Sequence, residues 1–436
     1  MDPKNSTTII NANILTMDEH LNAYPNGYVK ITDGLIEAVG EDFRGSPEQS
    51  ENLLDAKGGI VIPGMINCHT HAAMSLFRGL GDDEPDRLYR YIYPLEKEYV
   101  TPEFVRLGSE LSCAEMLLSG TTFFADMYFF EEEVAMAAEQ MGIRVLAGQT
   151  VMNRPLPDAD HFEDGIKRAE EFCRGWKHSS LVEPCIAPHA PYSLERNQLI
   201  QIMEFSKEHE TDVQMHVAES EREEKFISQL GETSSVSYLN SLNLLNERLL
   251  AAHCIRINEA DIQLLEEHDC RVSHNPVANT KGAHGTCPLY ELLEQKIIVG
   301  LGTDGPMSGN NLDLFRQMAV AAPLQKNLKG DRTLIDSKQI LSLATLRGAE
   351  ALGKGGSTGS IETGKWADLV VFDSESVRHT PLHDPYSTVV YSLQASDVKD
   401  VFVSGKQVVD NGILVNSDLN QITNKAREFI SKWPSL

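Results

Sequence analysis

Two histidines separated by one residue lie directly after an apolar run, in Asn67-Cys68-His69-Thr70-His71. Alternate side chains of an extended strand share a face, so His69 and His71 can point to the same side at the end of one strand. A catalytic zinc site needs three protein ligands or more and an open position for water. The pair therefore predicts half of a metal site. Two unconnected histidines are the alternative unless further ligands follow.

Two later residues complete the expected donor set. His216, in Gln214-Met215-His216-Val217-Ala218-Glu219, would be the third nitrogen ligand, and Asp304, in Gly302-Thr303-Asp304-Gly305, would add a carboxylate. Three imidazoles and one carboxylate leave room for a water molecule on zinc, which is the arrangement of a hydrolytic site. Each residue alone also has a structural interpretation, as a satisfied core histidine or as a helix N-cap. Their common position at the ends of predicted strands favours one metal centre.

Three further polar residues have the chemistry that hydrolysis requires. Glu219 would act as general acid and base if the strand ends near Val217 and the chain turns, because in an unbroken strand it would face away from His216. Otherwise it begins a solvated acidic helix. His253 would orient or polarise the attacking water, and His189 would donate a hydrogen bond to the substrate.

The elements that must position these residues alternate between short apolar runs and helical patterns from about residue 58 to 305. This alternation is typical of repeated βα units around a parallel sheet, and eight such units predict a TIM-type (β/α)8 barrel with its chemistry at the C-terminal strand ends. The predicted strands are residues 59–71, 121–128, 144–151, 181–189, 212–219, 249–254, 270–276 and 297–305.

The two ends of the chain have a different pattern. Residues 7–17 read as a strand, and residues 28–40 read as a hairpin with an Asp33-Gly34 turn. Residues 367–373 and 398–410 again predict strands, and a helix is expected over 419–432. We therefore expect a small β-sandwich domain formed from both termini. Its predicted parts are residues 1–57 and 358–436, and the barrel occupies residues 58–357.

Charge and composition exclude several classes of partner. The formal net charge of −26 disfavours polymeric nucleic acid and anionic membranes, and it is compatible with a small-molecule substrate. Seven scattered cysteines without a Cys-x-x-Cys motif argue against a disulfide framework or a cysteine zinc cage. The sequence has no long apolar run and no signal-like start, so a cytoplasmic protein is expected. Nothing in the sequence excludes a homo-oligomer.

Six motifs occur together in this chain. They are Pro63 to His71, Ala187-Pro188-His189-Ala190-Pro191-Tyr192, His216-Val217-Ala218-Glu219, Ala252-His253-Cys254, Ser273-His274-Asn275-Pro276 and Gly302-Thr303-Asp304. Together they resemble the amidohydrolase superfamily, and within it the deaminases of S-adenosylhomocysteine and methylthioadenosine, a group that extends to triazine chlorohydrolases and guanine deaminases. The resemblance implies zinc bound by His69, His71, His216 and Asp304, with Glu219 and Asp304 shuttling protons and His253 assisting the water.

The same resemblance implies substrate contacts from His189 and from Glu96, which would accept hydrogen bonds from ribose hydroxyls. One position departs from the family pattern. Adenosylhomocysteine deaminases have an arginine after the third strand that binds the amino-acid carboxylate, and here Gln149 occupies that place. The neutral amide of glutamine cannot form the charge-assisted hydrogen bonds that an arginine makes to a carboxylate. Either Arg154 substitutes for it, or the substrate is methylthioadenosine, adenosine or another aminated heterocycle without a carboxylate.

These observations predict a zinc-dependent aminohydrolase with one metal ion, because the fourth strand ends at His189 without the lysine that bridges two metals in related sites. Iron or manganese could replace zinc, since ligand type alone gives only a preference. The alternatives are a hydrolase of the same fold acting on guanine, pterin or triazine rings by deamination, dechlorination or N-dealkylation. A non-enzymatic scaffold is disfavoured because every candidate ligand is present.

Overall fold

The computed structural model describes residues 6–43 and 51–433. They fold into two compact units. One contains the described residues up to Asn67 together with Ala114–Phe123 and Asp313–Asp418. The other contains Cys68–Cys113, Phe124–Leu312 and the C-terminal segment from Leu419. The domain boundaries expected from the sequence stay a prediction.

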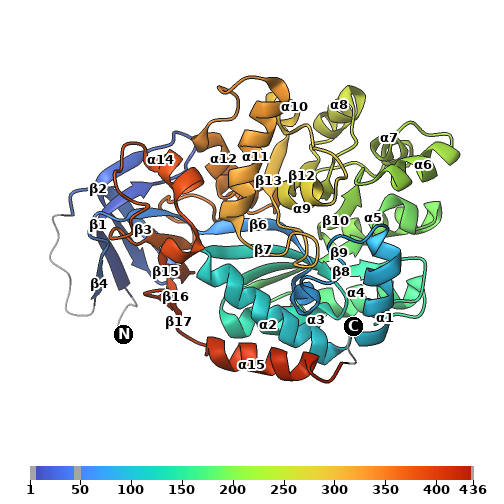
Figure 1. The fold of residues 1–436 in the computed structure, drawn as a ribbon, viewed down its shortest axis with the longest axis horizontal. Coiled ribbons are helices and arrows are strands. Elements are labelled where there is room, and N and C mark those ends of the chain that lie inside the picture. The colour runs from blue at the N-terminus through green and yellow to red at the C-terminus, as the bar shows by residue number, and fades with distance from the viewer. Residues whose placement is uncertain (1–5, 44–50, 434–436) are drawn as a thin grey trace. The chain divides into compact units, whose positions relative to one another are not determined.

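Eight parallel strands follow one another in chain order in a single sheet (Figure 1). They are β6 (Met65–Thr70), β7 (Thr121–Tyr128), β8 (Arg144–Val151), β9 (Val182–Pro188), β10 (Val213–Val217), β11 (Leu249–His253), β12 (Arg271–His274) and β13 (Ile298–Leu301). The backbone N–H groups of Thr303 and Asp304 donate to the carbonyl of His69, at 3.2 and 3.0 Å, which joins the ends of the first and last strands. The predicted TIM-type barrel is confirmed.

The barrel strands are apolar because helices cover them. Every residue of β7 and β8 is buried, as expected for strands of a parallel sheet whose two faces are both packed. The helices are α1 (Tyr93–Tyr99), α2 (Pro102–Leu118), α3 (Glu131–Met141), α4 (Phe162–Trp176), α5 (Arg196–His209), α6 (Glu221–Gln229), α7 (Ser235–Ser241), α8 (Glu259–Glu267), α9 (Pro276–Lys281), α10 (Leu289–Glu294), α11 (Leu314–Lys329), α12 (Ser337–Leu343), α13 (Leu346–Ala351), α14 (Pro385–Ser387) and α15 (Leu419–Ile430). The short 3-10 and π helices are η1 (Ala72–Phe77), η2 (Leu88–Ile92), η3 (Pro191–Ser193), η4 (Thr388–Ser392) and η5 (Ala395–Asp397).

A second sheet is formed by strands from both ends of the chain, as predicted. Its strand order is β17-β16-β15-β14-β5-β1-β2-β3, with β4 paired to β1. The bounds are β1 (Ser6–Leu15), β2 (Ala23–Thr32), β3 (Leu35–Glu41), β4 (Glu51–Asp55), β5 (Ile60–Pro63), β14 (Leu369–Phe372), β15 (Val398–Val403), β16 (Lys406–Asp410) and β17 (Ile413–Leu414). Its core is built from branched and aromatic side chains that include Ile14, Ile31 and Phe402.

The single strand predicted over residues 59–71 is wrong, because this apolar run contributes to two sheets. β5 pairs with β1 and β14 in the terminal sheet, whereas β6 belongs to the barrel. Gly64 separates them, and its N–H donates to the Asp368 carbonyl at 2.8 Å. A side chain at Gly64 would overlap that of Thr122. Hydrophobic patterning cannot detect this change of sheet, because both strands are buried.

The C-terminal helix α15 belongs to the same unit as Phe104 of α2, whose ring its Phe429 contacts at a centroid distance of 6.3 Å. Just beyond it, the Trp433 ring stacks on Phe104 of α2, with centroids 6.1 Å apart and an interplanar angle of 15°. It also contacts Tyr99, at a centroid distance of 4.6 Å. Aromatic packing therefore anchors this end of the described chain.

Among residues 6–43 and 51–433, no helix has both the length and the apolar character needed to cross a membrane.

Candidate metal centre and the cavity beside it

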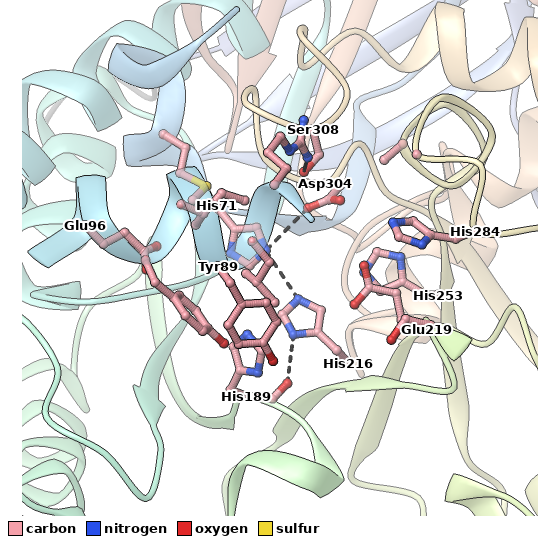
Figure 2. A pocket seen from close by; sticks show the side chains of 18 of the residues that line it. His71, Tyr89, Glu96, His189, His216, Glu219, His253, His284, Asp304 and Ser308 are labelled. Atoms are coloured by element: carbon pink, nitrogen blue, oxygen red, sulfur yellow. Dashed lines mark hydrogen bonds and ion pairs between the residues drawn. The ribbon is translucent and has the colours of Figure 1, made fainter. Parts of the chain in front are cut away.

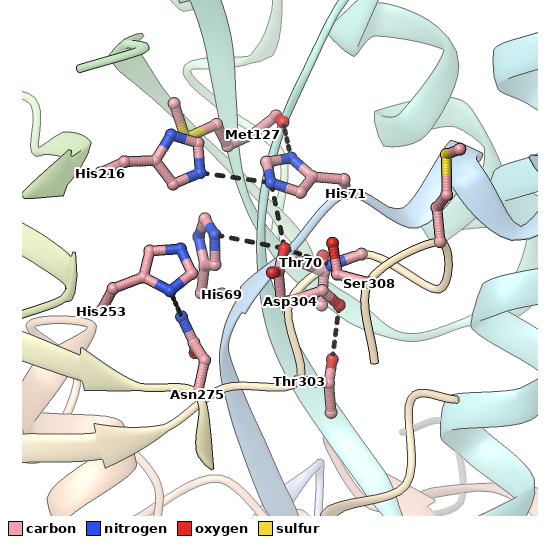
Figure 3. A network of polar contacts seen from close by, with 12 residues as sticks. His69, Thr70, His71, Met127, His216, His253, Asn275, Thr303, Asp304 and Ser308 are labelled. Carbon is pink, nitrogen blue, oxygen red and sulfur yellow. Dashed lines mark hydrogen bonds and ion pairs between the residues drawn. The ribbon is translucent and has the colours of Figure 1, made fainter. Parts of the chain in front are cut away.

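Four of the predicted ligands meet at the C-terminal ends of β6, β10 and β13 (Figure 3). The Nε2 atom of His71 lies 3.3 Å from Nε2 of His216 and 3.4 Å from Oδ1 of Asp304. Nε2 of His69 lies 3.9 Å from the same carboxylate oxygen. The four residues expected at the ends of different strands are therefore brought together.

Backbone carbonyl groups orient two of these rings. Nδ1 of His71 lies 2.6 Å from the carbonyl oxygen of Met127, and Nδ1 of His216 lies 2.8 Å from that of His189. A carbonyl oxygen only accepts hydrogen bonds, so both Nδ1 atoms carry the proton. Each Nε2 atom then presents a lone pair toward the cluster, which is how metal-ligating histidines are commonly prepared.

The donor set fits a divalent metal ion such as zinc. Nε2 of His69 is buried and has no hydrogen-bond partner among the described residues, although buried polar atoms are normally paired. Burial lowers the pKa of His69 and of His216 well below the usual range, so both rings are neutral ligands. Burial opposes ionisation of Asp304, but His253, His71 and His69 lower the pKa of this carboxyl overall. Three imidazoles and one carboxylate are donors that zinc commonly binds in proteins.

Asp126, at the end of β7, anchors the segment that carries the first two histidines. Its Oδ1 atom accepts hydrogen bonds from Thr70 Oγ1, at 2.5 Å, and from the N–H of Ala72, at 2.6 Å. These bonds hold both neighbours of His71. Asp126 is one of the polar residues near the ends of the predicted strands, but the sequence did not indicate its role.

The backbone is strained at three strand ends around the cluster. Ala218, His253, Cys254 and Asp304 have φ values of +53°, +76°, +44° and +60°, in the left-handed region that residues with a Cβ avoid. Such strain costs about 1–3 kcal/mol per residue and gathers at functional sites. Packing beside the cluster is also close at Gly302, where an added Cβ would lie 2.5 Å from Ser273 Oγ and 3.0 Å from His69 Cβ, so that only glycine fits there.

Glu219 can share a site with His216 only if the strand ends near Val217 and the chain turns, and the structure meets this condition. β10 ends at Val217, and the left-handed Ala218 turns the chain. The Glu219 carboxylate consequently lies at the cavity, with Oε1 4.0 Å from Nε2 of His253. Glu219, the predicted general acid and base, and His253, predicted to assist the water, therefore lie together beside the candidate metal ligands.

The His253 ring is held by an amide that the sequence did not single out. Nδ1 of His253 lies 2.8 Å from Oδ1 of Asn279, so Nε2 faces the cavity. Burial opposes a charge on this ring, but the Glu219 and Asp304 carboxylates raise the pKa of His253 overall. Asn279 lies on α9 rather than at a strand end, so no strand-end pattern could have found it.

A cavity of about 620 Å³ opens beside the cluster. The predicted site residues that line it are His71, Glu96, Arg154, His189, His216, Glu219, His253 and Asp304. Figure 2 shows that Glu96 and Glu219 lie on opposite sides of the His71 and His216 pair. A ligand in this space can therefore touch one carboxyl group at each end.

Glu96, on α1, is a buried carboxyl at the end of the cavity away from Glu219. Burial raises the pKa of Glu96 to about 8, and Arg154 and Tyr128 act in the opposite direction. The guanidinium carbon of Arg154 lies 3.6 Å from the centroid of the Tyr93 ring, a cation–π contact. This part of the cavity thus combines one cation, one carboxyl group and aromatic surface.

Gln149 is not brought to the cavity. Its side chain is fully buried, and Nε2 donates to Asp158 Oδ2 at 2.9 Å and to the Thr150 carbonyl at 3.2 Å. Alternation along β8 sends neighbouring side chains to opposite faces, and Thr150 is the one that lines the cavity. Arg154, from the loop after β8, is the charged residue of this segment that lines the cavity.

A sequence profile described as the Amidohydrolase family matches residues 60–408. The chain belongs to this family. A protein of Syntrophus aciditrophicus named 5-methylthioadenosine/S-adenosylhomocysteine deaminase 1 is 37% identical over 430 residues, which cover 98% of this chain and 97% of the relative. A 5'-deoxyadenosine deaminase of Methanosarcina acetivorans is 38% identical over 423 residues and covers 96% of each chain.

Solved structures share the fold over nearly the whole chain. An adenosine deaminase from Xanthomonas campestris with bound zinc has a TM-score of 0.94 at 32% identity and covers 98% of both chains. An atrazine chlorohydrolase from Arthrobacter aurescens has a TM-score of 0.88 at 21% identity and covers 97% of this chain and 100% of that one. The family resemblance inferred from the motifs is confirmed.

Proposed function

We propose that this amidohydrolase is a metal-dependent deaminase of the adenine ring in a nucleoside such as 5'-methylthioadenosine, S-adenosylhomocysteine or 5'-deoxyadenosine. The observation that carries the proposal is the placement of Glu219 and His253 beside a cluster of three histidines and one aspartate in one cavity. Names of full-length relatives at 37 and 38% identity support the substrate class.

The metal would be held by His69, His71, His216 and Asp304. One zinc ion fits this set, because its donors are imidazole nitrogens and a carboxylate. A zinc ion there would lower the pKa of a water molecule and so supply a nucleophile near neutral pH. Each Nδ1–H···O=C bond of His71 and His216 keeps the ligand nitrogen directed inward.

The protein side chains would move the protons of the reaction. Glu219 would accept a proton from the attacking water and deliver it to the ring nitrogen next to the amine-bearing carbon. His253, oriented by Asn279, would hold the oxygen as its bond to carbon forms. The carbon–nitrogen bond then breaks as the second water proton passes from the new hydroxyl group to the exocyclic amine, a transfer that Asp304 would assist; ammonia leaves and a ring carbonyl remains.

The far end of the cavity would bind the sugar. Glu96 would accept hydrogen bonds from ribose hydroxyl groups, and His189, whose buried Nδ1 has no hydrogen-bond partner among the described residues, would bond to the base or the sugar. Arg154 would contact the group attached at the 5' carbon. The structure gives Gln149 other partners, so this proposal includes Arg154 and omits Gln149 as a substrate contact.

Ammonia release from a panel of substrates tests this function. Purified protein with measured zinc, iron and manganese content would be incubated with 5'-methylthioadenosine, S-adenosylhomocysteine, 5'-deoxyadenosine, adenosine, guanine, a pterin and a chlorotriazine. We expect ammonia and the corresponding inosine from at least one adenosine derivative, with the highest kcat/KM in that group. Release of chloride or of an alkylamine, with no deamination of any nucleoside, would show that a different hydrolase reaction occurs here.

A further inference from the structure

The turn that brings Glu219 to the cavity needs support from outside the turn itself. Ala218 precedes Glu219 and has φ of +53°, a conformation that costs a residue with a Cβ about 1–2 kcal/mol. Nothing in an Ala-Glu dipeptide favours this geometry. Neighbouring groups must therefore fix it.

A second carboxylate, that of Glu223, binds both N–H groups of this turn. The N–H of Ala218 donates to Oε1 of Glu223 at 2.7 Å, and the N–H of Glu219 donates to Oε2 at 3.0 Å. Ser235 Oγ donates to Oε1 at 2.5 Å. The Glu223 side chain is fully buried, so no water competes for these bonds.

The carbonyl group of Ala218 is fixed from the opposite direction. It accepts hydrogen bonds from the N–H groups of Ile255, at 3.1 Å, and of Arg256, at 2.9 Å. Both donors follow β11 and lie just beyond His253. The peptide groups of Ala218 therefore link the loop that carries Glu219 to the loop that carries His253.

Ordinary helix capping does not account for this arrangement. Ser220 is the N-cap of α6, and its hydroxyl accepts from the N–H of Glu223. A glutamate three residues after the N-cap usually bonds back to the N–H of the N-cap residue itself. Glu223 instead reaches past Ser220 and binds the two preceding N–H groups.

We propose that Glu223 is a positioning residue that fixes the Ala218-Glu219 turn and so holds the Glu219 carboxylate beside His253 at the cavity. The proposal rests on the proposed role of Glu219 in proton transfer. Two oxygen acceptors are required, because the turn presents two N–H groups. Glutamine in place of Glu223 offers one oxygen acceptor and an NH2 group that would oppose the second N–H.

Steady-state kinetics of Glu223→Gln provide the first test. A shift of about 1 Å in a reacting group can cost about 100-fold in rate, so we expect kcat to fall by about 10- to 100-fold while KM and bound metal stay within about twofold of wild type. The matched control is Glu224→Gln, which changes the neighbouring, partly exposed carboxylate paired with Arg256. A kcat for Glu223→Gln equal to that of the control would overturn the proposal.

A double-mutant cycle with Glu219→Gln separates positioning from a general loss of structure. If Glu223 acts through Glu219, adding Glu223→Gln to Glu219→Gln lowers kcat no further, although each change alone lowers it. Multiplicative effects of the two substitutions would contradict action through Glu219. If Glu223→Gln fails to fold, Glu223→Asp replaces it in the cycle, because the shorter side chain keeps the charge but loses reach.

Hydrogen exchange gives a readout that needs no substrate. In a peptide covering residues 216–221, the amides of Ala218 and Glu219 should be protected in wild type and exchange at least 10-fold faster in Glu223→Gln. Unchanged protection would overturn the positioning role even if kcat falls. If no nucleoside is deaminated, the proposed function fails and this measurement still decides whether Glu223 holds the turn.

Discussion

The Nε2 atoms of His71 and His216 lie 3.3 Å apart, at the ends of two strands that are not neighbours in the barrel. Both rings have their Nδ1 atom at a backbone carbonyl, so two lone pairs face each other across this distance. That arrangement is unfavourable by itself and becomes favourable with a cation bound to both nitrogens. The carboxylate of Asp304, 3.4 Å from His71 Nε2, supplies the compensating negative charge.

The first prediction concerns Asp304, which combines a ligand position with that charge. Asp304→Asn should abolish stoichiometric metal binding and reduce deamination below detection, because a neutral amide oxygen is a much weaker ligand than a carboxylate. Elemental analysis of the purified variant checks this. Asp331→Asn, at an exposed position, serves as the control. Full activity of Asp304→Asn without metal would contradict the metal-dependent mechanism.

The second prediction separates metal binding from proton transfer. Glu219→Gln should keep wild-type metal content, since Glu219 is not among the clustered ligands, and should lose about 100- to 10,000-fold in kcat. The measurement is kcat beside metal stoichiometry on the same sample. Turnover close to that of wild type would remove Glu219 from the mechanism.

The third prediction follows from the protonation of Glu96. Burial raises the pKa of Glu96 to about 8, whereas the ordinary value is 4.5, so between these pH values the folded protein holds a proton that the unfolded chain has released. The free energy of unfolding therefore falls as pH rises through this window, by up to about 1.4 kcal/mol per pH unit from this group.

Glu96→Gln removes this pH dependence. The variant should gain stability relative to wild type as pH rises from 5 to 8, and the difference should level off above 8. Denaturant unfolding of the substrate-free proteins across that range provides the measurement. A difference that does not vary with pH would show that Glu96 has no raised pKa.

The fourth prediction contrasts Gln149 on β8 with Arg154 in the loop that follows this strand. Arg154→Gln should raise KM for a substrate with a charged 5' group by about 10-fold or more and leave metal content unchanged, because the guanidinium lines the cavity. Gln149→Ala should instead lower stability and leave KM within about twofold, because Gln149 bonds to Asp158. KM values for S-adenosylhomocysteine and 5'-methylthioadenosine, measured on both variants, distinguish the two positions. The reverse pattern would restore Gln149 as the substrate contact.

The fifth prediction concerns the packing of the C-terminal segment. Trp433→Ala should destabilise the protein by about 1–3 kcal/mol, because this partly buried ring contacts Phe104 and Tyr99. Thermal unfolding would show the loss, and Lys432→Ala, at an exposed position, is the control. A midpoint unchanged from wild type would show that the aromatic contacts contribute nothing to stability.

The barrel and the clustering of the candidate ligands could be predicted because both leave strong local signals. β7 and β8 have the bounds expected from their apolar runs, and His69, His71, His216 and Asp304 all lie at strand ends. The division of residues 59–71 at Gly64 could not be predicted, because the sequence is equally apolar on both sides of the point where the chain changes sheets.

The remaining site residues depend on local geometry that has no pattern in the sequence. Alanine rarely adopts the left-handed conformation, so nothing at Ala218 signals the turn that brings in Glu219. Gln149 misses the cavity because its side chain lies on the other face of β8 from Thr150. Arg154 lines the cavity because of the path of the loop after β8. The partners of His253 and of the turn, Asn279 and Glu223, lie on helices and face inward only in the assembled barrel.

The hydrogen bonds between the ends of the first and last barrel strands join residues that are synthesised at different times. The N–H of Asp304 donates to the carbonyl of His69. During synthesis His69 leaves the ribosome early, and Asp304 follows more than 200 residues later. A growing chain exposes His69 and His71 long before it can offer Asp304. The complete candidate donor set therefore exists only after residue 304 has been synthesised, and a chain that ends earlier contains only part of it.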